Sequence, residues 1–443
     1  MHLSGVRTLV VGMARSGLAC VELLRSQGAL VRATDAKPEA GAPLEALGVP
    51  FAAQCPAVFN DCDLIVVSPG VPYDLPELEA ARGRGVRVTG EVELAGAFLK
   101  GPVIGVTGSN GKTTTTALTG HILREAGIPV QVGGNIGVAV SAMVAASRDD
   151  QWNVLELSSF QLETMAEFRA GIGVALNVTP DHLDRHKTMA AYSAAKARLF
   201  ETQRAGDFAV LNADDAECVG YASRTAASPL WFSASRAITP GVWIEDGALW
   251  FDGERVMTLS EIPLRGMHNA ENTMAAAAAA RLAGASIPAI ASAVRSFQGV
   301  EHRLEFVRNL RGVNYYNDSK ATNVDATMKA LDAFEGRLFV ILGGKDKGSD
   351  YTALRAVLER KARAVLLIGA AAPKIREQLA AALGPRLKDC ETLGNAVAEA
   401  HREASEGDTI LLAPACASFD QFDNFEHRGR VFKELVNRLE SRG

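Results

Sequence analysis

The sequence has few cysteines and no excess of positive charge, and each absence excludes a class of protein. The six cysteines are scattered along 443 residues without a CxxC pair. We therefore expect reduced thiols in a cytosol and no disulfide framework. The formal net charge is -5, so no overall positive field attracts nucleic acid or anionic lipid. Any anionic ligand must therefore be bound by local groups, and we expect neither nucleic acid nor a membrane as a partner.

The sequence also lacks a long uninterrupted apolar run. The most apolar long segment, residues 273–294, is rich in alanine and is interrupted by Arg281 and Pro288, which predicts soluble helices. The N-terminal run TLVVGM has the length of a strand and lacks the basic region and cleavage site of a signal peptide. With 48% apolar and 22% charged residues, the composition is typical of a globular protein, and we predict a cytoplasmic one.

Three α/β domains are expected from the chain length and from the order of its apolar segments. At roughly 150 residues per domain, the chain has room for about three. Apolar strands that run into glycine turns begin at RTLVVG (7–12), GPVIGVTG (101–108) and RLFVILGG (337–344), and strands alternating with helices are typical of parallel sheets. The Asp–Gly turns at 246–247 and 252–253 indicate hairpins. We predict Rossmann-like domains at 1–98 and 300–443, and a P-loop-type ATPase-like domain at 99–299 with a small antiparallel sheet beside its parallel one.

The glycine-rich segment TGSNGKTT, at residues 107–114, is the most specific motif. It lies between an expected buried strand and an expected helix, where backbone N–H groups and the helix N-terminus can bind phosphate oxygens. Lys112 supplies a positive charge, and the Thr113 hydroxyl can ligate Mg²⁺. The common pattern GxxxxGK[ST] is not strictly met, because Val106 occupies the first glycine position. The alternative is an ordinary glycine turn with an incidental lysine.

Glu156 lies near the end of the expected strand WNVLELSS. An NTPase places a metal-holding carboxylate at such a position. The simpler alternative is a solvated residue at the edge of a strand.

The turn GMARSG, at residues 12–17, is followed by Asp35 at the end of the next expected strand, which resembles a dinucleotide-binding fingerprint. Ala14 stands where that fingerprint has its second glycine, so a nicotinamide site is disfavoured. A different nucleotide diphosphate, bound near Arg15 or Ser16, fits as well.

Two further features combine charged and apolar positions. The segment TPDHLDRH places His182 and His186 four residues apart, as on one helical face, so metal binding and simple solvent exposure are both open. Lys196 has Tyr192, Leu199 and Phe200 at helical spacing, which puts it on an apolar face. Burial of an ammonium is costly, so the simpler interpretation is a snorkelling lysine.

Taken together, ordered blocks along nearly the whole chain resemble the Mur ligase family. They are TGSNGKTT, GNIG, LELSSFQLE, NVTPDHLDRH, YSAAK, MHNAEN, EHRLE, YNDSKATN and LLAPACASFDQFDNFEHRG. Within the family, SPGVP, DSKATN, LGGKDKG and PACASFDQF resemble the members that add D-glutamate. The resemblance implies an ATP-dependent carbon–nitrogen ligase of peptidoglycan precursor synthesis, which joins D-glutamate to UDP-N-acetylmuramoyl-L-alanine through an acyl phosphate.

The resemblance also implies roles for single residues. Catalysis would involve Lys112, Glu156, His182 and Lys196, of which Lys196 would be carbamylated by CO₂. Two Mg²⁺ ions would be held by Thr113, Glu156, His182 and Lys196. ATP would be bound by Gly108, Ser109, Asn110, Gly111, Lys112, Thr113, Thr114, Asn272, His302, Arg303 and Asp318. The UDP-linked substrate would be bound by Arg15, Ser16, Asp35, Ser68, Asn135, Ser158 and Gln161. D-Glutamate would be bound by Thr322, Lys347, Ser418 and Phe425.

One position departs from the family pattern. An acidic residue is expected directly after the GG of the third domain, but this chain has Lys345 there, followed by Asp346. The carboxylate contacts at this site are therefore expected to be rearranged.

Other functions explain less of the sequence. A related ligase with a different acceptor disagrees with the PACASFDQF block. A P-loop ATPase switch or a dinucleotide-binding oxidoreductase accounts for one motif each. We therefore predict a ligase that acts as a monomer on small molecules.

Overall fold

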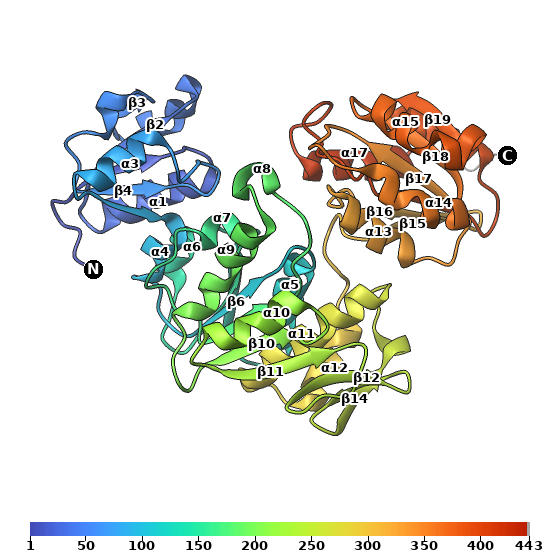
Figure 1. Cartoon of the computed structure of the whole chain (residues 1–443), viewed down its shortest axis with the longest axis horizontal. Helices are drawn as coiled ribbons and strands as arrows, with labels where there is room; N and C mark the ends of the chain where they lie inside the picture. The colour runs from blue at the N-terminus through green and yellow to red at the C-terminus, as the bar shows by residue number, and fades with distance from the viewer. Residues whose placement is uncertain (441–443) are drawn as a thin grey trace. The chain divides into compact units, whose positions relative to one another are not determined.

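The computed structural model of the chain describes residues 1–440. They form three β-sheets with helices packed on them (Figure 1), which confirms the predicted α/β class. The chain divides into two compact units. Unit one comprises Met1–Glu261 and Glu271–Ser296, and unit two comprises Ile262–Ala270 and the described chain from Phe297 onward.

The first sheet of unit one has five parallel strands in the order β3-β2-β1-β4-β5. The central strands β1 and β4 have buried and mainly apolar side chains on both faces, as expected of parallel strands covered by helices on each side. Residues of α1 and α4 pack on one face, and residues of α3 pack on the other. The strands are β1 (Arg7–Val11), β2 (Leu30–Asp35), β3 (Phe51–Ala53), β4 (Leu64–Val67) and β5 (Arg87–Gly90). The helices are α1 (Arg15–Ser26), α2 (Ala42–Glu45), α3 (Pro76–Gly83) and α4 (Glu91–Gly96).

The second sheet of unit one has nine strands in the order β14-β13-β12-β11-β10-β9-β6-β8-β7. The parallel strands are β6 (Val103–Thr107), β7 (Val130–Gly134), β8 (Trp152–Glu156), β9 (Ile172–Ala175), β10 (Phe208–Asn212), β11 (Ser228–Ser233) and β12 (Gly241–Glu245). Helix α9 (Met189–Glu201) packs in the core on one side, with α6 (Val140–Met143) and α10 (Ala216–Tyr221). Helix α5 (Lys112–Glu125) packs on β7 and β8, and α12 (Ile287–Ser296) packs on α5.

The predicted antiparallel strands are present, but they do not form a separate sheet. The hairpin strands β13 (Ala248–Phe251) and β14 (Glu254–Thr258) pair antiparallel with each other, and β13 pairs antiparallel with β12. Strand β12 pairs parallel with β11, so the hairpin extends the central sheet at its edge. A hairpin signal fixes only the pairing across its own turn, and the partner of its first strand is set by packing.

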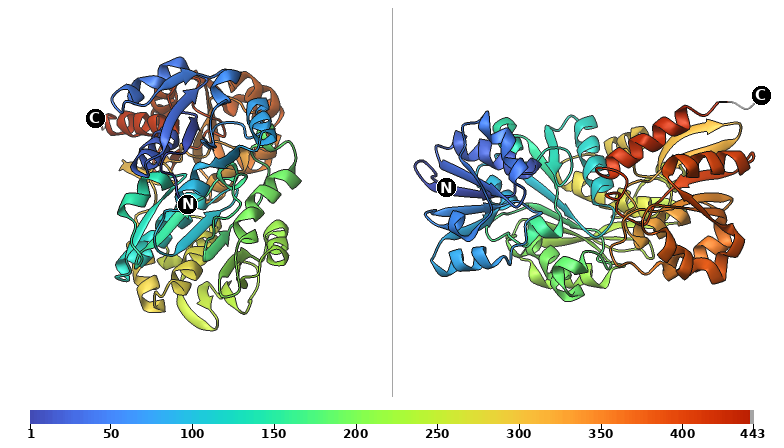
Figure 2. Two further views of the ribbon diagram at one scale, coloured as in Figure 1. Left: turned by 90° about the vertical axis from the view of Figure 1, so that its left-hand side faces the viewer. Right: turned by 90° about the horizontal axis from the view of Figure 1, so that it is seen from above.

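The sheet of unit two has the order β15-β16-β20-β17-β18-β19, and only the β15–β16 pair is antiparallel. The strands are β15 (Glu305–Leu310), β16 (Val313–Asn317), β17 (Leu338–Gly343), β18 (Ala362–Ile368), β19 (Leu387–Glu391) and β20 (Thr409–Leu412). Helices α13 (Val324–Asp332), α14 (Arg355–Lys361) and α15 (Ala372–Leu383) pack on one face of this sheet. Helices α16 (Leu393–Glu403) and α17 (Phe425–Asn437) pack on the other (Figures 1 and 2).

The start of helix α17 is fixed by a side-chain cap. It begins at Phe425, because the Asn424 side chain accepts a hydrogen bond from the backbone N–H of His427 and caps the helix. The helix therefore includes Phe425, which the sequence predicts to bind D-glutamate. No helix within residues 1–440 is both long and apolar enough to cross a membrane.

Candidate active site

The phosphate loop joins β6 to α5, as predicted. Gly108 and Gly111 have φ angles of 154° and 87°, which favour glycine. Lys112 is the first residue of α5, and its Nζ donates hydrogen bonds to the carbonyl oxygens of Gly108 at 2.8 Å and Ser109 at 2.9 Å. A Cβ on Gly111 would lie 2.2 Å from Oδ1 of Asn272. The structure therefore brings Asn272 directly onto the loop.

Side chains outside the loop fix its shape. The backbone N–H groups of Ser109 and Asn110 donate to the carbonyl and Oδ1 of Asn177, at 2.8 and 2.9 Å. The Ser109 hydroxyl donates to the carbonyl of Thr179 at 2.9 Å and lies 3.0 Å from the Tyr192 hydroxyl. The segment after β9 thus holds the loop by its backbone, so little reorganisation is needed when a phosphate binds.

Glu156 is buried, so the alternative of a solvated edge residue is wrong. It ends β8 and pairs in register with Val106 of β6, the strand that leads into the phosphate loop. Only 1% of the residue is exposed, and Oε1 accepts a hydrogen bond from Nδ2 of Asn135 at 2.8 Å. A carboxylate beside the loop is suited to a hard cation such as Mg²⁺.

Lys196 is also buried, so the interpretation as a snorkelling side chain is wrong. It lies on α9 with 1% of its surface exposed. Its Nζ donates to the carbonyl of Gly108 at 2.8 Å and lies 4.5 Å from the ring centroid of Tyr192. Burial lowers the pKa of Lys196 well below its ordinary value, and the nearby Lys112 ammonium lowers it further. The side chain is therefore far more readily deprotonated than an exposed lysine.

The two histidines of TPDHLDRH do not share a helical face. His182 has φ 54° and precedes the short helix α8 (Leu183–His186), and its ring lies 4.8 Å from that of Phe160. His186 is buried, stacks on Phe160 and lies 2.9 Å from the Ser159 hydroxyl through Nε2. Burial lowers the pKa of His186 to about 4, so its ring is neutral at physiological pH. A metal role for His182 remains a prediction.

The N-terminal glycine turn is held by two of the residues predicted to bind the UDP-linked substrate. Both carboxylate oxygens of Asp35 accept backbone hydrogen bonds, from Met13 at 2.6 Å and Lys37 at 2.8 Å. The Ser68 hydroxyl donates to the carbonyl of Gly12 at 2.7 Å. These contacts shape the turn, and direct binding by either side chain remains a prediction.

Four of the other residues predicted for that substrate lie at helix starts, and one of them also lines a cleft. Arg15 is the exposed first residue of α1, followed by half-buried Ser16. Ser158 and Gln161 form a capping box at the start of the short helix α7 (Ser159–Leu162). Ser68 and Gln161 line one cleft beside Glu91, so the structure brings these two predicted residues together.

In unit two, the residues predicted to bind D-glutamate follow the carboxyl ends of parallel strands, where open α/β sheets bind ligands. Thr322 follows β16, Lys347 follows β17, and Ser418 follows β20. Ser418 is 2% exposed, whereas Lys347 is exposed and Thr322 is half-buried. Phe425 begins α17, and its carbonyl accepts a hydrogen bond from the Ser319 hydroxyl at 2.8 Å.

The departure at Lys345 leaves a defined local structure. The backbone of Lys345 forms a two-way bridge with Ala417, and its side chain is exposed. Asp346 accepts hydrogen bonds from Lys374 Nζ and Tyr351 hydroxyl, both at 2.8 Å. The carboxylate of Asp346 is therefore held in place by two side chains of unit two.

Among the predicted ATP residues of unit two, His302 has a strained backbone, and Arg303 and Asp318 each have a buried polar atom without a hydrogen-bond partner. His302 has φ 65°, a left-handed conformation that costs about 1–3 kcal/mol for a residue other than glycine. Asp318 is 2% exposed, and its Oδ1 has no hydrogen-bond partner, as is true of the buried Nε of Arg303. Burial raises the pKa of Asp318 to about 6. Buried polar atoms without partners are rare and often mark functional sites.

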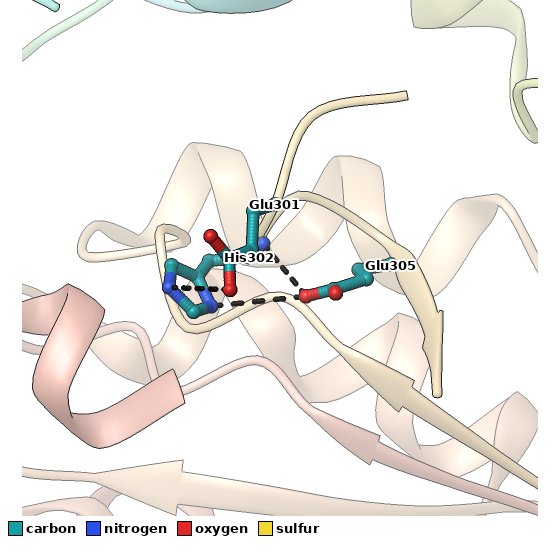
Figure 3. A group of neighbouring side chains, drawn as sticks. All are labelled: Glu301, His302 and Glu305. Atoms are coloured by element: carbon teal, nitrogen blue, oxygen red, sulfur yellow. Dashed lines mark hydrogen bonds and ion pairs between the residues drawn. The ribbon is translucent and has the colours of Figure 1, made fainter. Parts of the chain in front are cut away.

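Among residues 1–440, one group of three potential metal-ligating side chains has its ligand atoms within 4.8 Å of one another, namely Glu301, His302 and Glu305 (Figure 3). Lys433 Nζ donates to Glu301 at 2.5 Å and to Glu305 at 2.9 Å. His302 Nδ1 lies 2.9 Å from Nδ2 of Asn317. Because a lysine ammonium lies against both carboxylates, this group is an ion-pair network that orients His302.

Some residues that shape these sites were not identified from the sequence. Asn177 and Tyr192 support the phosphate loop, and Tyr351 and Arg428 support the loops of unit two. Arg428 had a usable signal, because Phe425 and Phe432 lie on its helical face as Tyr192 and Phe200 lie on that of Lys196. Asn177 lies in the block NVTPDHLDRH, but its contacts with the phosphate loop depend on the pairing of distant strands and could not be read from that block.

Comparisons with known proteins agree with this arrangement. Residues 6–90 match the Mur ligase MurD-like N-terminal domain, residues 106–280 the Mur ligase middle domain, and residues 302–416 the glutamate ligase domain of Mur ligases. UDP-N-acetylmuramoylalanine--D-glutamate ligase of Solibacter usitatus is 65% identical, over 99% of each chain. The protein of the same name from Acidobacterium capsulatum is 51% identical, over 98% of this chain and 97% of its own.

Solved structures show the same fold at lower identity. UDP-N-acetylmuramate-alanine ligase of Thermotoga maritima is 21% identical, with a TM-score of 0.63 over 98% of this chain and 99% of its own. A pseudomurein peptide ligase of Methanothermus fervidus is 17% identical, with a TM-score of 0.62 over 98% of this chain and 100% of its own. Because relatives 65% and 51% identical cover at least 97% of each chain, and three Mur ligase domains match along the sequence, the chain belongs to the Mur ligase family.

Proposed function

We propose that this chain is an ATP-dependent ligase that joins the carboxylate of UDP-N-acetylmuramoyl-L-alanine to the amine of D-glutamate. The observation that carries the proposal is the phosphate loop, with Lys112 at the start of α5 and buried Glu156 on the adjacent strand. Two relatives over the whole chain have this activity in their names. The reaction supplies a peptidoglycan precursor, so it supports cell-wall synthesis, cell shape and division.

The residues around the phosphate loop fit a Mg²⁺–ATP substrate. Ligases of this family use ATP and Mg²⁺. Thr113 and Glu156 offer the oxygen ligands that Mg²⁺ prefers, and His182 would serve a second ion. The bound ions would neutralise the charge that develops on the transferred phosphoryl group. Lys112 would be placed by the loop against the β- and γ-phosphates.

Lys196 fits a carbamate, which would make it an anionic partner for a metal ion. The amine must be unprotonated to attack CO₂, and burial of Lys196 with Lys112 nearby favours the unprotonated form. In the reaction, the amine nitrogen bonds to the carbon of CO₂ and loses a proton, leaving an anionic carbamate. The ring of Tyr192 lies directly beside this nitrogen.

The two reacting partners would be held by different sets of residues. The UDP-linked substrate would contact the N-terminal turn through Arg15, Ser16, Asp35 and Ser68, and the central sheet through Asn135, Ser158 and Gln161. Its carboxylate would attack the γ-phosphate and form an acyl phosphate. The D-glutamate amine, with its carboxylates held by Lys347, Ser418, Thr322 and the start of α17, would then displace phosphate. Since all the reactants are anions, positioning and charge neutralisation would supply most of the catalysis.

This proposal assigns a role to each predicted domain. Residues 1–98 would bind the UDP moiety, residues 99–299 would bind ATP, including through Asn272, and residues 300–443 would bind the amino acid, with His302, Arg303 and Asp318 on the ATP side. We also propose a cytoplasmic monomer. All six cysteines are free, as is usual in a reducing compartment.

The test is phosphate release by the purified chain with ATP, Mg²⁺ and UDP-N-acetylmuramoyl-L-alanine. D-Glutamate should stimulate release, whereas L-glutamate, L-alanine and diaminopimelate should not. Mass spectrometry of the product should show the added glutamyl residue. Stimulation by another amino acid would retain the ligase and refute the acceptor, and release that needs no acceptor would refute the ligase.

A further inference from the structure

Arg428 is a buried cation with no role in the mechanism above. It lies on α17, three residues after Phe425, and none of its surface is exposed. Burial lowers the pKa of Arg428 to about 10, so the side chain is still charged at neutral pH. A buried charge is costly unless its hydrogen bonds are satisfied. The hydrogen-bond partners of Arg428 therefore indicate its role.

Its guanidinium uses all five of its N–H donors. Nε donates to the Ser319 hydroxyl at 2.9 Å, and Nη2 donates to the Ser319 carbonyl at 2.8 Å and the Cys416 carbonyl at 3.1 Å. Nη1 donates to the carbonyls of Cys416 at 3.2 Å and Ala417 at 3.4 Å. None of these acceptors is a carboxylate. The fork formed by Nε, Nη1 and Nη2 of Arg428 therefore binds backbone and hydroxyl oxygens only.

Those oxygens belong to the loops that carry the proposed D-glutamate residues. Ser319 lies in the loop after β16, three residues before Thr322, and Ala417 directly precedes Ser418 in the loop after β20. The Ser319 hydroxyl also donates to the carbonyl of Phe425. One guanidinium therefore joins the positions of three proposed binding residues.

The loop that carries Lys347 is tied to the same group. A Cβ on Gly344 would lie 3.1 Å from Nη1 of Arg428 and 2.2 Å from the carbonyl of Ala417, so this loop packs against the fork. Farther along, the Tyr351 hydroxyl donates to Asp346 at 2.8 Å and lies 3.0 Å from Sγ of Cys416. These polar contacts therefore connect Arg428, through Cys416 and Tyr351, to Asp346, the residue next to Lys347.

We propose that Arg428 is a positioning residue for the acceptor amino acid, because its fork sets the spacing of the loops that bear Thr322, Lys347, Ser418 and Phe425. This inference rests on the proposed function. The acceptor is a small dicarboxylate, and two carboxylates at fixed separation can be held only if the donors keep their spacing. Lysine has three donors on a flexible stem and cannot reproduce the planar fork.

The test compares steady-state kinetics of the full-length wild type with Arg428→Lys and Ser319→Ala. Arg428→Lys should raise KM for D-glutamate by about tenfold or more, which corresponds to about 1.4 kcal/mol. KM for ATP should change by less than about twofold, and kcat at saturating D-glutamate should fall less than KM rises, because the fork touches loops and no reactant. Ser319→Ala removes one acceptor of the fork and should shift KM for D-glutamate in the same direction.

Arg337→Lys is the matched control. Arg337 pairs with Asp408 at 2.9 Å, at the amino ends of β17 and β20 and thus at the opposite edge of the same sheet. This variant tests general destabilisation of unit two and should leave KM for D-glutamate unchanged. Circular dichroism and Tm confirm folding, and if Arg428→Lys does not fold, Ser319→Ala decides.

Three results would overturn the inference. An unchanged KM for D-glutamate in the folded variants, or equal shifts for D-glutamate and ATP, would refute a positioning role while the wild type still shows D-glutamate-dependent release. Absence of that release in the wild type would refute the proposed function and this inference together.

Discussion

Asp318 allows a prediction in which stability and activity change in opposite directions. Its carboxyl group is buried, Oδ1 has no hydrogen-bond partner, and burial raises its pKa from 3.8 to about 6, against the opposing effect of Arg303. An acid whose pKa is raised on folding stabilises the fold at low pH. That contribution is lost as the pH rises from about 4 through 6. Above pH 7, the ionised side chain should therefore destabilise unit two.

The size of the effect follows from the shift. About two pKa units correspond to about 3 kcal/mol, so the ionised carboxyl should cost about 3 kcal/mol at pH 7.5 and about 1 kcal/mol at pH 4.5. Asp318→Asn keeps the shape and removes the charge. Relative to the wild type, the variant should therefore gain about 2 kcal/mol of unfolding free energy between pH 4.5 and pH 7.5. Its ATP-dependent phosphate release should fall if Asp318 serves the nucleotide.

Hydrogen exchange measured by mass spectrometry can follow this change in unit two alone. The amide of Asp318 donates to the carbonyl of Leu412, so peptides covering β16 and β20 report the local free energy of opening. All four tryptophans lie within residues 152–250 of unit one, so their fluorescence is an internal reference. Asp325→Asn on α13 is the matched control, because its ion pair with Lys329 is partly solvated and worth about 0–1 kcal/mol. If the stability difference between Asp318→Asn and the wild type is the same at both pH values, the burial argument is refuted.

Three further predictions concern the lysines. Lys112→Ala should leave the protein folded and reduce turnover by about 100-fold or more, since a charge on a desolvated phosphoryl group is worth several kcal/mol; near-normal turnover would end the phosphate-loop assignment. Lys196→Ala should be inactive and partly rescued by acetate or formate, and activity untouched by the substitution would exclude the carbamate. Lys347→Ala should raise KM for D-glutamate by about 30-fold, with little change for ATP, if binding of D-glutamate desolvates the exposed lysine and a substrate carboxylate as a charge pair. Lys345→Ala, at an exposed neighbouring position, is its control, and equal effects in both would argue against a specific contact.

Much of the fold could be predicted because its signals are local. Parallel strands such as Leu64–Val67 are continuous apolar runs, since helices cover both faces of the sheet. The phosphate loop was identified from its glycines, and Gly108 and Gly111 have φ angles that favour glycine. These features depend on a few adjacent residues, so the sequence is sufficient to identify them.

The environment of Lys196 could not be predicted in the same way. The helical spacing of Tyr192 and Phe200 placed the lysine on an apolar face, but such a face permits a buried amine or a stem that reaches water. Whether the amine is buried depends on the Gly108 carbonyl, which accepts a hydrogen bond from Nζ and lies 88 residues away in the chain. The same limit applies to Glu156, whose burial depends on the strands that flank it.

Fixed positive charge lies at the loops of both units that are proposed to bind anions. Lys196 and Lys112 donate to one carbonyl, that of Gly108. Because burial and the neighbouring Lys112 lower the pKa of Lys196, Lys112 is the cation of the phosphate loop. Arg428 places another cation behind the loops proposed to bind D-glutamate. ATP, the UDP-linked carboxylate and D-glutamate are all anions, whereas the chain itself has a net charge of -5 and would repel them as a whole. Selective binding must therefore come from charge fixed within the loops, where low solvent access strengthens each interaction. Salt screens exposed charges more strongly than buried ones. We therefore expect activity to fall with rising salt much less than it would if exposed charges bound the substrates.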